Sequence, residues 1–550
     1  MRWQQLTLGI LTLLLFCSCS RQQWATVARQ EVYGGTFKLM ITSPVETLDP
    51  QKILFLQDWE IAALIFEGLV GYGENWNTVQ PLLAESWQEM DDGRRWIFSL
   101  RRDVYFQDDP CMPQGKGRRM VAQDVLYTFE RLATPATQCW NWYLLAGKIQ
   151  GIDDFYQHRA VTISGISVLD DSHVEFRLTK SYSTFLKILA TTNAYIVPKE
   201  AVEFYGENFN QHPVGTGPFR LVRWKPLQEL LLLKNDHYWR RSTYQQQLPF
   251  LDAVQFQVVS SSALAFSEFL KGENYLLKAD EKFYQRLRNE TLSPDKYQVV
   301  SKVPGLSLRF LGISMDNGSP TLQHADFRQA LAKAFDRTPL VSELREFDYI
   351  PANSLVPAYF FKDDFFSWHQ VDTVAAKAVF AGYGDLLKKN PLAVATNLDG
   401  SKDVELFQKT MQRYTVPVRI DYQPLQYYEN IVQRHPDLFR VSYLPSFPDP
   451  EEYYSLFYSK SDPQINLTGY RNAEYDLTLE QAMVERDEAK RLQLFTHLEQ
   501  ILARDVPALY LNHDSQSYYI VPAFVHGMEI GFIIPDYRQV WLESAHEPAR

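Results

Sequence analysis

The sequence predicts an α/β protein with more than one domain, on three observations. A chain of 550 residues is too long for one ordinary hydrophobic core and indicates two or three domains. Beyond about residue 280, strand-like runs such as residues 308–314 alternate with amphipathic helical patterns such as residues 327–335, which is typical of an α/β lobe. Residues 70–198 instead combine short strands with short helices, as a compact α+β subdomain does.

A rigid turn is predicted over residues 213–219, PVGTGPF. Gly215 and Gly217 tolerate a positive φ or the close approach of another backbone, and Pro218 fixes its own φ and withholds a donor. An apolar run follows at once, so we expect the turn to lead the chain into a sheet strand over residues 219–224.

The other elements follow from hydrophobic periodicity. Apolar residues alternate with polar ones in most of the expected strands, and they recur every three or four positions in the expected helices. The expected strands are residues 36–42, 96–100, 174–178, 230–233, 252–259, 308–314, 392–396, 418–422 and 506–510. The expected helices are residues 58–69, 122–132, 327–335, 404–414 and 474–503.

The composition is that of a folded soluble protein, with 45% hydrophobic and 22% charged residues. A net charge of −11 argues against a nucleic-acid partner, and none is expected. The chain carries 12 Trp, 31 Tyr and 34 Phe, a surplus that suits cores, domain interfaces or a large pocket with flat, stiff walls.

The N-terminus is expected to be a targeting segment: a lipoprotein signal peptide over residues 1–19 and a tether over residues 20–34. Arg2 supplies the positive start, and residues 6–16 form an apolar core that is too short to span a bilayer as a mature helix. No later run reaches eighteen consecutive apolar residues.

Cys19 is the expected lipidation site because the small residue Ser18 precedes it, whereas the bulky Phe16 precedes Cys17. Several acyl chains on one cysteine would anchor the protein stably to a membrane. The alternative is a cleaved signal without lipid. Ser20 does not favour retention at the inner membrane, so both membranes stay open.

Cys111 and Cys139 are expected to form a disulfide, because an exported compartment oxidises thiols. No histidine lies between these two isolated cysteines, and no metal site is expected.

An enzyme would need a nucleophile with a base, or a metal cluster. The chain contains no Gly-x-Ser-x-Gly and no His-Glu-x-x-His, and histidines such as His212, His435 and His513 stand alone. A lone histidine is more often structural than catalytic, so we expect no catalytic residues.

Several short motifs recur in order along the chain. They are ETLDP (46–50), FEGLV (66–70), PLLAESW (81–87), WIFSLR (96–101), VAQDVLYTF (121–129), PVGTGPF (213–219), NDHYW (235–239), FRQALA (327–332), FDR (335–337), GYRN (469–472) and YD (475–476). In this order and at these intervals they resemble the periplasmic solute-binding proteins of peptide and nickel ABC importers, family 5. The resemblance extends from about Gly35 to about Gly527.

The resemblance implies a two-lobed periplasmic-binding-protein fold, class II-like, with an extra α+β subdomain. Lobe I is expected to comprise residues 35–60, 199–280 and 511–550. The extra subdomain would comprise residues 61–198, and lobe II residues 281–510. Two lobes joined by two crossings form a hinge that can close around a ligand.

The resemblance also implies a substrate-binding lipoprotein that captures peptides, here oligopeptides, between the lobes. It would deliver them to an inner-membrane ABC permease with ATPase subunits. We expect a periplasmic monomer without cofactor, anchored by lipid to the inner or outer membrane, or a cell-surface protein in a bacterium with one membrane. The alternatives are a non-peptide solute (a modified peptide, haem or a nickel complex) and an exported hydrolase.

In the family, the segment after Leu-Asp-Pro crosses the cleft, and a strand matching residues 439–450 lines it and pairs with the bound peptide. The expected ligand-binding residues are Ile53, Leu54, Leu56, Arg440, Ser442, Tyr443, Leu444, Ser446, Asp449 and Tyr510. Arg440 falls where the oligopeptide binders carry a cleft arginine for a ligand carboxylate, although pairing with an acid would explain it equally well.

Ser446 departs from the family pattern. Matching Asp449-Pro450 to the family's acidic-Pro pair puts Ser446 where an aspartate takes the α-ammonium of the peptide. A serine accepts a hydrogen bond but offers no charge-assisted pair. Either Asp449 replaces the missing acid, or the ligand is a modified peptide or another solute.

Overall fold

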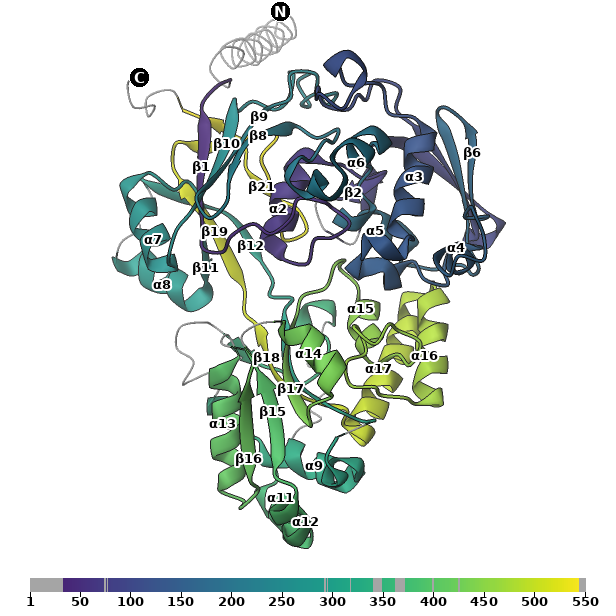
Figure 1. The fold of residues 1–550 in the computed structure, drawn as a ribbon. Helices are drawn as coiled ribbons and strands as arrows, with labels where there is room; N and C mark the ends of the chain where they lie inside the picture. The colour runs from purple at the N-terminus through teal and green to yellow at the C-terminus, as the bar shows by residue number, and fades with distance from the viewer. Residues whose placement is uncertain are drawn as a thin grey trace, which may run out of the picture.

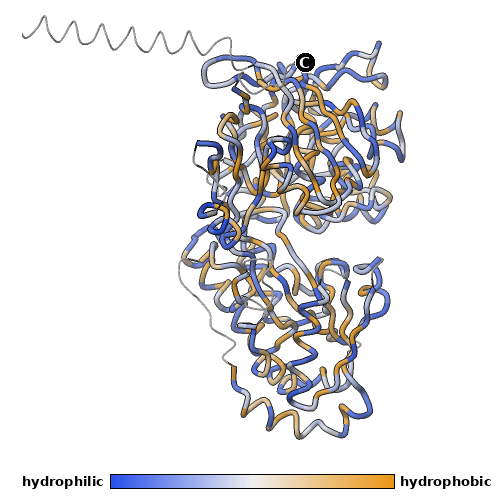
Figure 2. Tube along the Cα trace, turned by 90° about the vertical axis from the view of Figure 1, so that its left-hand side faces the viewer, coloured by the Kyte–Doolittle hydropathy of each residue, from blue (hydrophilic) through white to orange (hydrophobic). Residues whose placement is uncertain are grey.

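The computed structural model describes residues 33–543, except 74–75, 77, 291–292, 294, 317, 340–348, 362–370, 398–399 and 424–425. Its strands and helices form two lobes, one above the other in Figure 1. Figure 2, turned by 90°, shows them joined along one side. The predicted two-lobed α/β fold is confirmed.

The upper lobe is built on a four-stranded sheet in the order β1-β10-β9-β8. These strands are β1 (Thr36–Ile41), β8 (Phe219–Lys225), β9 (Glu229–Lys234) and β10 (Ala253–Val258), with β1 and β10 parallel. The predicted turn leads into β8. A Cβ on Gly215 would lie 2.1 Å from the carbonyl oxygen of Ile65, the last residue of α2 (Leu56–Ile65), so only glycine permits this approach.

The extra subdomain carries its own four-stranded sheet, in the order β4-β5-β7-β6. Its strands are β4 (Ala84–Met90), β5 (Arg95–Leu100), β6 (Ile166–Asp170) and β7 (His173–Arg177). Helix α3 (Ala122–Leu132) packs on this sheet, with the buried Phe129 edge-on to Phe176 at 5.1 Å between ring centroids. The shorter helices are α4 (Ile152–Tyr156), α5 (Phe185–Leu189) and α6 (Lys199–Tyr205).

A three-stranded sheet, β11-β19-β12, joins the upper lobe to the lower one. It comprises β11 (Leu277–Asp280), β12 (Tyr297–Val303) and β19 (Ser517–Pro522). Helices α7 (Ser262–Lys271) and α8 (Glu281–Glu290) share a small core with it, which includes Phe269 and Ile520.

The lower lobe holds a six-stranded sheet, β14-β18-β13-β17-β15-β16. The strands are β13 (Leu308–Ile313), β14 (Tyr349–Pro351), β15 (Leu392–Thr396), β16 (Val418–Tyr422), β17 (Leu438–Tyr443) and β18 (Ala508–Asp514). The helices are α9 (Ala325–Ala334), α11 (Thr373–Gly382), α12 (Gly384–Lys389), α13 (Ser401–Gln412), α14 (Tyr427–Arg434), α15 (Pro450–Tyr454), α16 (Ala473–Val484) and α17 (Glu488–Asp505). β13 is buried along almost its whole length, as a central strand covered on both faces should be.

Short two-stranded pairings complete the fold. They are β2 (Val70–Tyr72) with β3 (Val79–Pro81), β20 (Val525–His526) with β23 (Trp541–Leu542), and β21 (Glu529–Ile530) with β22 (Pro535–Asp536). Among the described helices, none is long and apolar enough to cross a membrane.

Two details differ from the sequence prediction. The helical pattern over residues 474–503 is two helices, because the side chain of Asp487 caps α17 by accepting from the N–H of Lys490. The crossings between lobes lie after Val303 and after Asp514, since β12 still pairs in the upper part and β18 belongs to the lower sheet. The lobe boundaries drawn at residues 280 and 510 are therefore displaced along the chain.

Cys111 and Cys139 are free thiols, so the structure does not contain the predicted disulfide. The N–H of Cys111 donates to Asp109 Oδ1 at 2.9 Å, whereas Cys139 precedes the short 3-10 turn Trp140–Leu144. Burial raises the pKa of each thiol to about 12, so neither is a reactive thiolate at neutral pH. The prediction rested on the compartment alone, which says nothing about how the two sulfurs are placed. Cys19 lies outside the described residues.

Candidate ligand-binding site

A cavity of about 830 Å³ lies between the lobes. Its walls from the upper lobe are the segment of residues 53–59 and the 3-10 turn of the extra subdomain around Asn141. The lower lobe contributes the edge of its sheet near β13 and β17, the start of α13, and residues 464–467. This volume is in the range of pockets that enclose most of a small ligand.

Most of the residues predicted at the cleft meet at this cavity. Those that line it are Ile53, Leu54, Leu56, Arg440, Ser442, Tyr443, Leu444 and Ser446. Asp449 and Tyr510 do not line it. Both are buried, at 2% and 4% exposure, Tyr510 within β18 and Asp449 at the start of α15.

β17 leaves the lower sheet at the cavity. Its pairing with β15 covers only Leu438 and Phe439, so the edge beyond them has no strand partner among the described residues. The Tyr427 hydroxyl bonds both the N–H and the C=O of Arg440, which shows that this residue directs its backbone groups away from β13. Because backbone groups alternate along a strand, those of Ser442 face the same way. Exposure rises at this point, from a buried Val441 to an exposed Ser442.

One end of the cavity is rich in cations. Arg309, Lys402 and Arg440 line it, and Asp403 is the single carboxylate among its described lining residues. Arg440 Nε donates to Asp403 Oδ2 at 3.0 Å, and both side chains are buried. Arg309 pairs with Asp514 at 2.5 Å. The first turn of α13, which contains Lys402, adds the positive end of a helix dipole.

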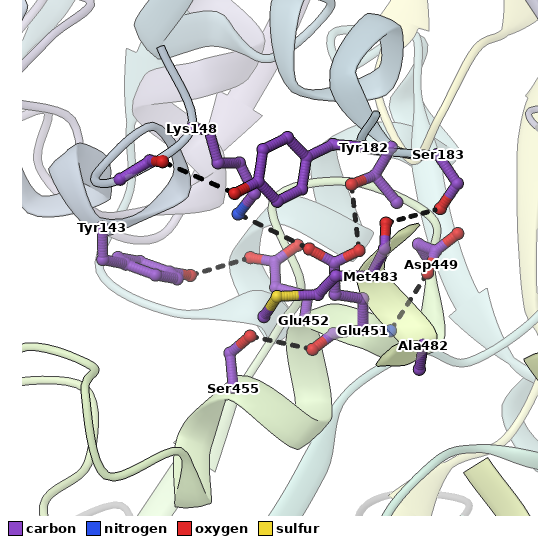
Figure 3. A network of polar contacts seen from close by, with 12 residues as sticks. Tyr143, Lys148, Tyr182, Ser183, Asp449, Glu451, Glu452, Ser455, Ala482 and Met483 are labelled. Carbon is purple, nitrogen blue, oxygen red and sulfur yellow. Dashed lines mark hydrogen bonds and ion pairs between the residues drawn. The ribbon is translucent and has the colours of Figure 1, made fainter. Parts of the chain in front are cut away.

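The other end of the cavity holds neutral groups. Asn141 donates to the hydroxyl oxygen of Ser446 at 3.1 Å, and also to Asn193. The buried Glu452 lies behind this pair and accepts from the N–H groups of Ser446 and Phe447 at 2.7 and 2.8 Å. The hydroxyl of Tyr143 reaches the same carboxylate at 3.1 Å, as Figure 3 shows.

Asp449 belongs to a different network, which joins the extra subdomain to the lower lobe (Figure 3). It forms two bonds with Arg491, at 2.7 and 2.9 Å, and one with Lys187 of α5 at 3.0 Å. Burial alone would raise the pKa of Asp449, but the charges of Arg491 and Lys187 hold it well below its usual range. Its oxygens are thus occupied within the protein, including a bond from the N–H of Glu451 that caps α15.

The comparisons with known proteins agree with this architecture. A sequence profile of the bacterial extracellular solute-binding proteins, family 5 (middle region), matches residues 78–464. The chain belongs to this family. It is therefore a solute-binding protein of the ABC-importer type, as the ordered motifs predicted.

This family 5 protein is 25% identical over 489 residues to the periplasmic oligopeptide-binding protein OppA of Escherichia coli, covering 85% of this chain and 86% of that one. It is 23% identical over 533 residues to the dipeptide-binding protein DppE of Bacillus subtilis, covering 92% of each chain. Among solved structures, DppA of Helicobacter pylori in complex with the peptide STSA superposes with a TM-score of 0.77 at 20% identity, covering 94% of this chain and 100% of that one. The murein tripeptide-binding protein MppA of Escherichia coli gives a TM-score of 0.76 at 20% identity, covering 93% and 99%.

Several lining residues were not predicted from the sequence, among them Trp59, Asn141, Tyr143 and Arg309. The indole N–H of Trp59 is buried and has no acceptor among the described residues, which makes it a donor available to a ligand. The dense aromatic segment after Cys139 was the one available signal for Asn141 and Tyr143. Arg309 carries no local signal, since it lies within an otherwise apolar strand.

Proposed function

We propose that this protein captures peptides in the cavity between its lobes and delivers them to an inner-membrane ABC permease with ATPase subunits. The free edge of β17 is the observation that carries the proposal. The backbone N–H and C=O of Ser442, and of Leu444 two residues on, can pair with an extended peptide as an added strand. The C=O of Ser442 accepts from the Tyr428 hydroxyl at 3.5 Å and keeps a second lone pair for the ligand. Such pairing recognises the peptide backbone, which every peptide shares, and so gives broad side-chain tolerance.

The charges of the cavity support an orientation for the ligand. The cation-rich end, with Arg309, Lys402 and Arg440, suits a peptide carboxylate, although the pair with Asp403 already neutralises part of the charge of Arg440. Ile53, Leu54 and Leu56 would cover the ligand from the upper lobe. The named relatives that bind oligopeptides and dipeptides support the same ligand class.

The cell-envelope location rests on the relatives and the N-terminal sequence. OppA of Escherichia coli is periplasmic. We propose that this chain is also periplasmic and works as a monomer. Lipid on Cys19 would anchor it to the inner or outer membrane, or at the cell surface in a bacterium with one membrane. Mass spectrometry of the membrane-extracted protein tests the anchor, because a diacylglyceryl group on Cys19 changes the mass of the N-terminal peptide.

Native mass spectrometry of the protein purified from cells, followed by denaturation, tests the ligand class. We expect a series of peptide masses to be released. One discrete non-peptide mass, such as haem or a nickel complex, would keep the binding role but overturn the peptide assignment. An empty protein that cleaves ester or peptide probes would instead favour a hydrolase.

A further inference from the structure

Among the described residues, the neutral end of the cavity contains no group that can balance a peptide ammonium. Ser446 and Asn141 are uncharged, and Asp403, the one carboxylate among the described lining residues, is paired with Arg440. Ser446 lies six residues after Arg440, which is a separation of up to roughly 20 Å in extended chain. An ammonium brought to Ser446 would lose its water without gaining an ion pair, which is strongly unfavourable.

Glu452 does not supply the missing charge. It is 1% exposed, does not line the cavity, and has hydrogen bonds to both carboxylate oxygens from Ser446, Phe447 and Tyr143. Burial raises the pKa of Glu452 to about 7, so a good part of it is protonated near neutral pH. The hydrogen bonds of Glu452 hold the loop that carries Ser446 in place.

A second cavity, of about 600 Å³, adjoins the first one. Tyr143 lines both cavities, and Phe447, the neighbour of Ser446, lines the second. As in the first cavity, one wall comes from the extra subdomain and the other from the lower lobe, here around α15 and α16. A ligand that continued past Ser446 would therefore enter a space that the same two lobes enclose.

The walls of the second cavity are aromatic and polar but have few unpaired charges. Lys148 lies 3.5 Å from Glu451 (Figure 3), and Lys180 lies 3.5 Å from Glu480, which also binds Lys460. The remaining two carboxylates accept backbone N–H groups. The rings of Trp142, Tyr143, Tyr182 and Tyr458 supply flat apolar surface. Such walls offer flat surface and hydrogen-bond partners to a group that carries amides or hydroxyls.

We propose that the preferred ligand is a peptide whose nitrogen at Ser446 is acylated, and that the acyl substituent extends into the second cavity. An amide N–H can donate to the hydroxyl oxygen of Ser446 without a counter-charge. The substituent can be a blocking acyl group or further residues of a longer peptide, since both present the same amide. This inference rests on the proposed peptide-binding function.

Calorimetric titration with three forms of one peptide tests the inference. The three forms are the free amine, the N-acetylated peptide, and the peptide with two more residues at its amino end. We expect the acetylated and extended forms to bind at least about tenfold more tightly than the free amine. If extension increases the affinity more than acetylation does, the natural substituent is a further stretch of peptide chain. If the two increase the affinity equally, a simple blocking group is sufficient. A free amine that binds as tightly as the others would overturn the inference while leaving the peptide function intact. If no peptide binds, the proposed function itself fails.

Two variants locate the effect. Ser446→Asp should reverse the preference in favour of the free amine by about tenfold or more, because it restores a counter-charge. Ala146→Trp, which places bulk in the second cavity, should weaken binding of the extended peptide and leave the free amine unchanged. Ala160→Trp, at a residue that lines neither cavity, is its matched control. Equal affinity of Ala146→Trp and Ala160→Trp for the extended peptide would contradict the assignment of the second cavity. The comparison on the unmodified protein decides the ligand class even if Ser446→Asp does not fold.

Discussion

At the scale of single residues, the proposed function depends on backbone groups, and Ser442 offers a direct test. Its N–H faces the open edge of β17, so Ser442→Pro removes one donor to the ligand without removing a bond to β13. We expect the peptide dissociation constant to rise by about tenfold or more, because a hydrogen bond partner in the ligand is left unpaired. Isothermal titration calorimetry measures this change.

Ser442→Ala is the matched control, since it keeps the N–H and removes only the hydroxyl. It should bind peptide nearly as well as the unmodified protein. Thermal unfolding of both variants separates lost binding from lost fold. Equal affinities for Ser442→Pro and Ser442→Ala would show that this strand edge does not pair with the ligand.

Glu499 of α17 predicts how stability changes with pH. It is fully buried and accepts from the N–H of Leu355 and the hydroxyl of Tyr454, at 3.1 and 3.2 Å. Burial raises its pKa to about 8 in the folded state, above the ordinary value of about 4.5. The folded state therefore holds this proton between those two pH values while the unfolded state has lost it, and stability falls as pH rises through this window.

Glu499→Gln keeps the size of the side chain and removes the titration. We expect the variant to lose this part of the pH dependence. Its free energy of unfolding, measured relative to that of the unmodified protein, should therefore be higher at pH 8 than at pH 5. The relative gain should be on the order of 1–3 kcal/mol. Urea unfolding at the two pH values measures it. A parallel pH dependence in both proteins would show that Glu499 is ionised in the folded state.

At the scale of elements, α5 and α15 connect the extra subdomain to the lower lobe through charged groups. Lys187 of α5 binds Asp449, and Thr184 donates to Glu451 at 3.0 Å. Lys187→Met leaves Asp449 paired with Arg491 inside the lower lobe, so the lobe should stay folded. The substitution removes the bond between Lys187 and Asp449, which joins the extra subdomain to the lower lobe. The closed arrangement is therefore destabilised, and peptide affinity should fall by about tenfold.

Small-angle scattering and calorimetry test this expectation together. Lys187→Met should populate a more open form without ligand and bind peptide more weakly. Lys199→Met is the control, since Lys199 is exposed and pairs at 3.4 Å with the exposed Glu203 on its own helix. An unchanged affinity in Lys187→Met would mean that closure does not depend on this contact.

The elements also show how far sequence reasoning reaches. Strands such as β13 and β15 and helices such as α3 are local patterns, and hydrophobic periodicity predicts them within a few residues. The break between α16 and α17 was missed because one capping side chain outweighs a continuous helical period. Cavity residues on β17 were predicted through the family motifs, whereas Trp59 and Arg309 reach the cavity through packing between distant segments, which no local pattern records.

At the scale of the whole molecule, the two lobes meet at two neighbouring crossings. Residues 304–307 and 515–516 carry the chain between the joining sheet and the lower sheet. At Gly305 the crossings nearly touch, because a Cβ there would lie 2.1 Å from the carbonyl oxygen of Asp514. A position this close to the neighbouring backbone accepts only glycine, and it lies on the path about which the lobes would rotate.

Gly305→Ala should therefore change closure without touching the ligand. The added methyl group must push the two crossings apart, so we expect the ligand-bound form to be less closed and the peptide dissociation constant to rise by about tenfold. Gly382→Ala is the matched control, because no atom lies within 4 Å of the position that its Cβ would take. Small-angle scattering of both variants measures the change in radius of gyration when peptide is added. If Gly305→Ala contracts as much as Gly382→Ala, the hinge tolerates the separation of its crossings, and closure must be governed by the contacts between α5 and α15 instead.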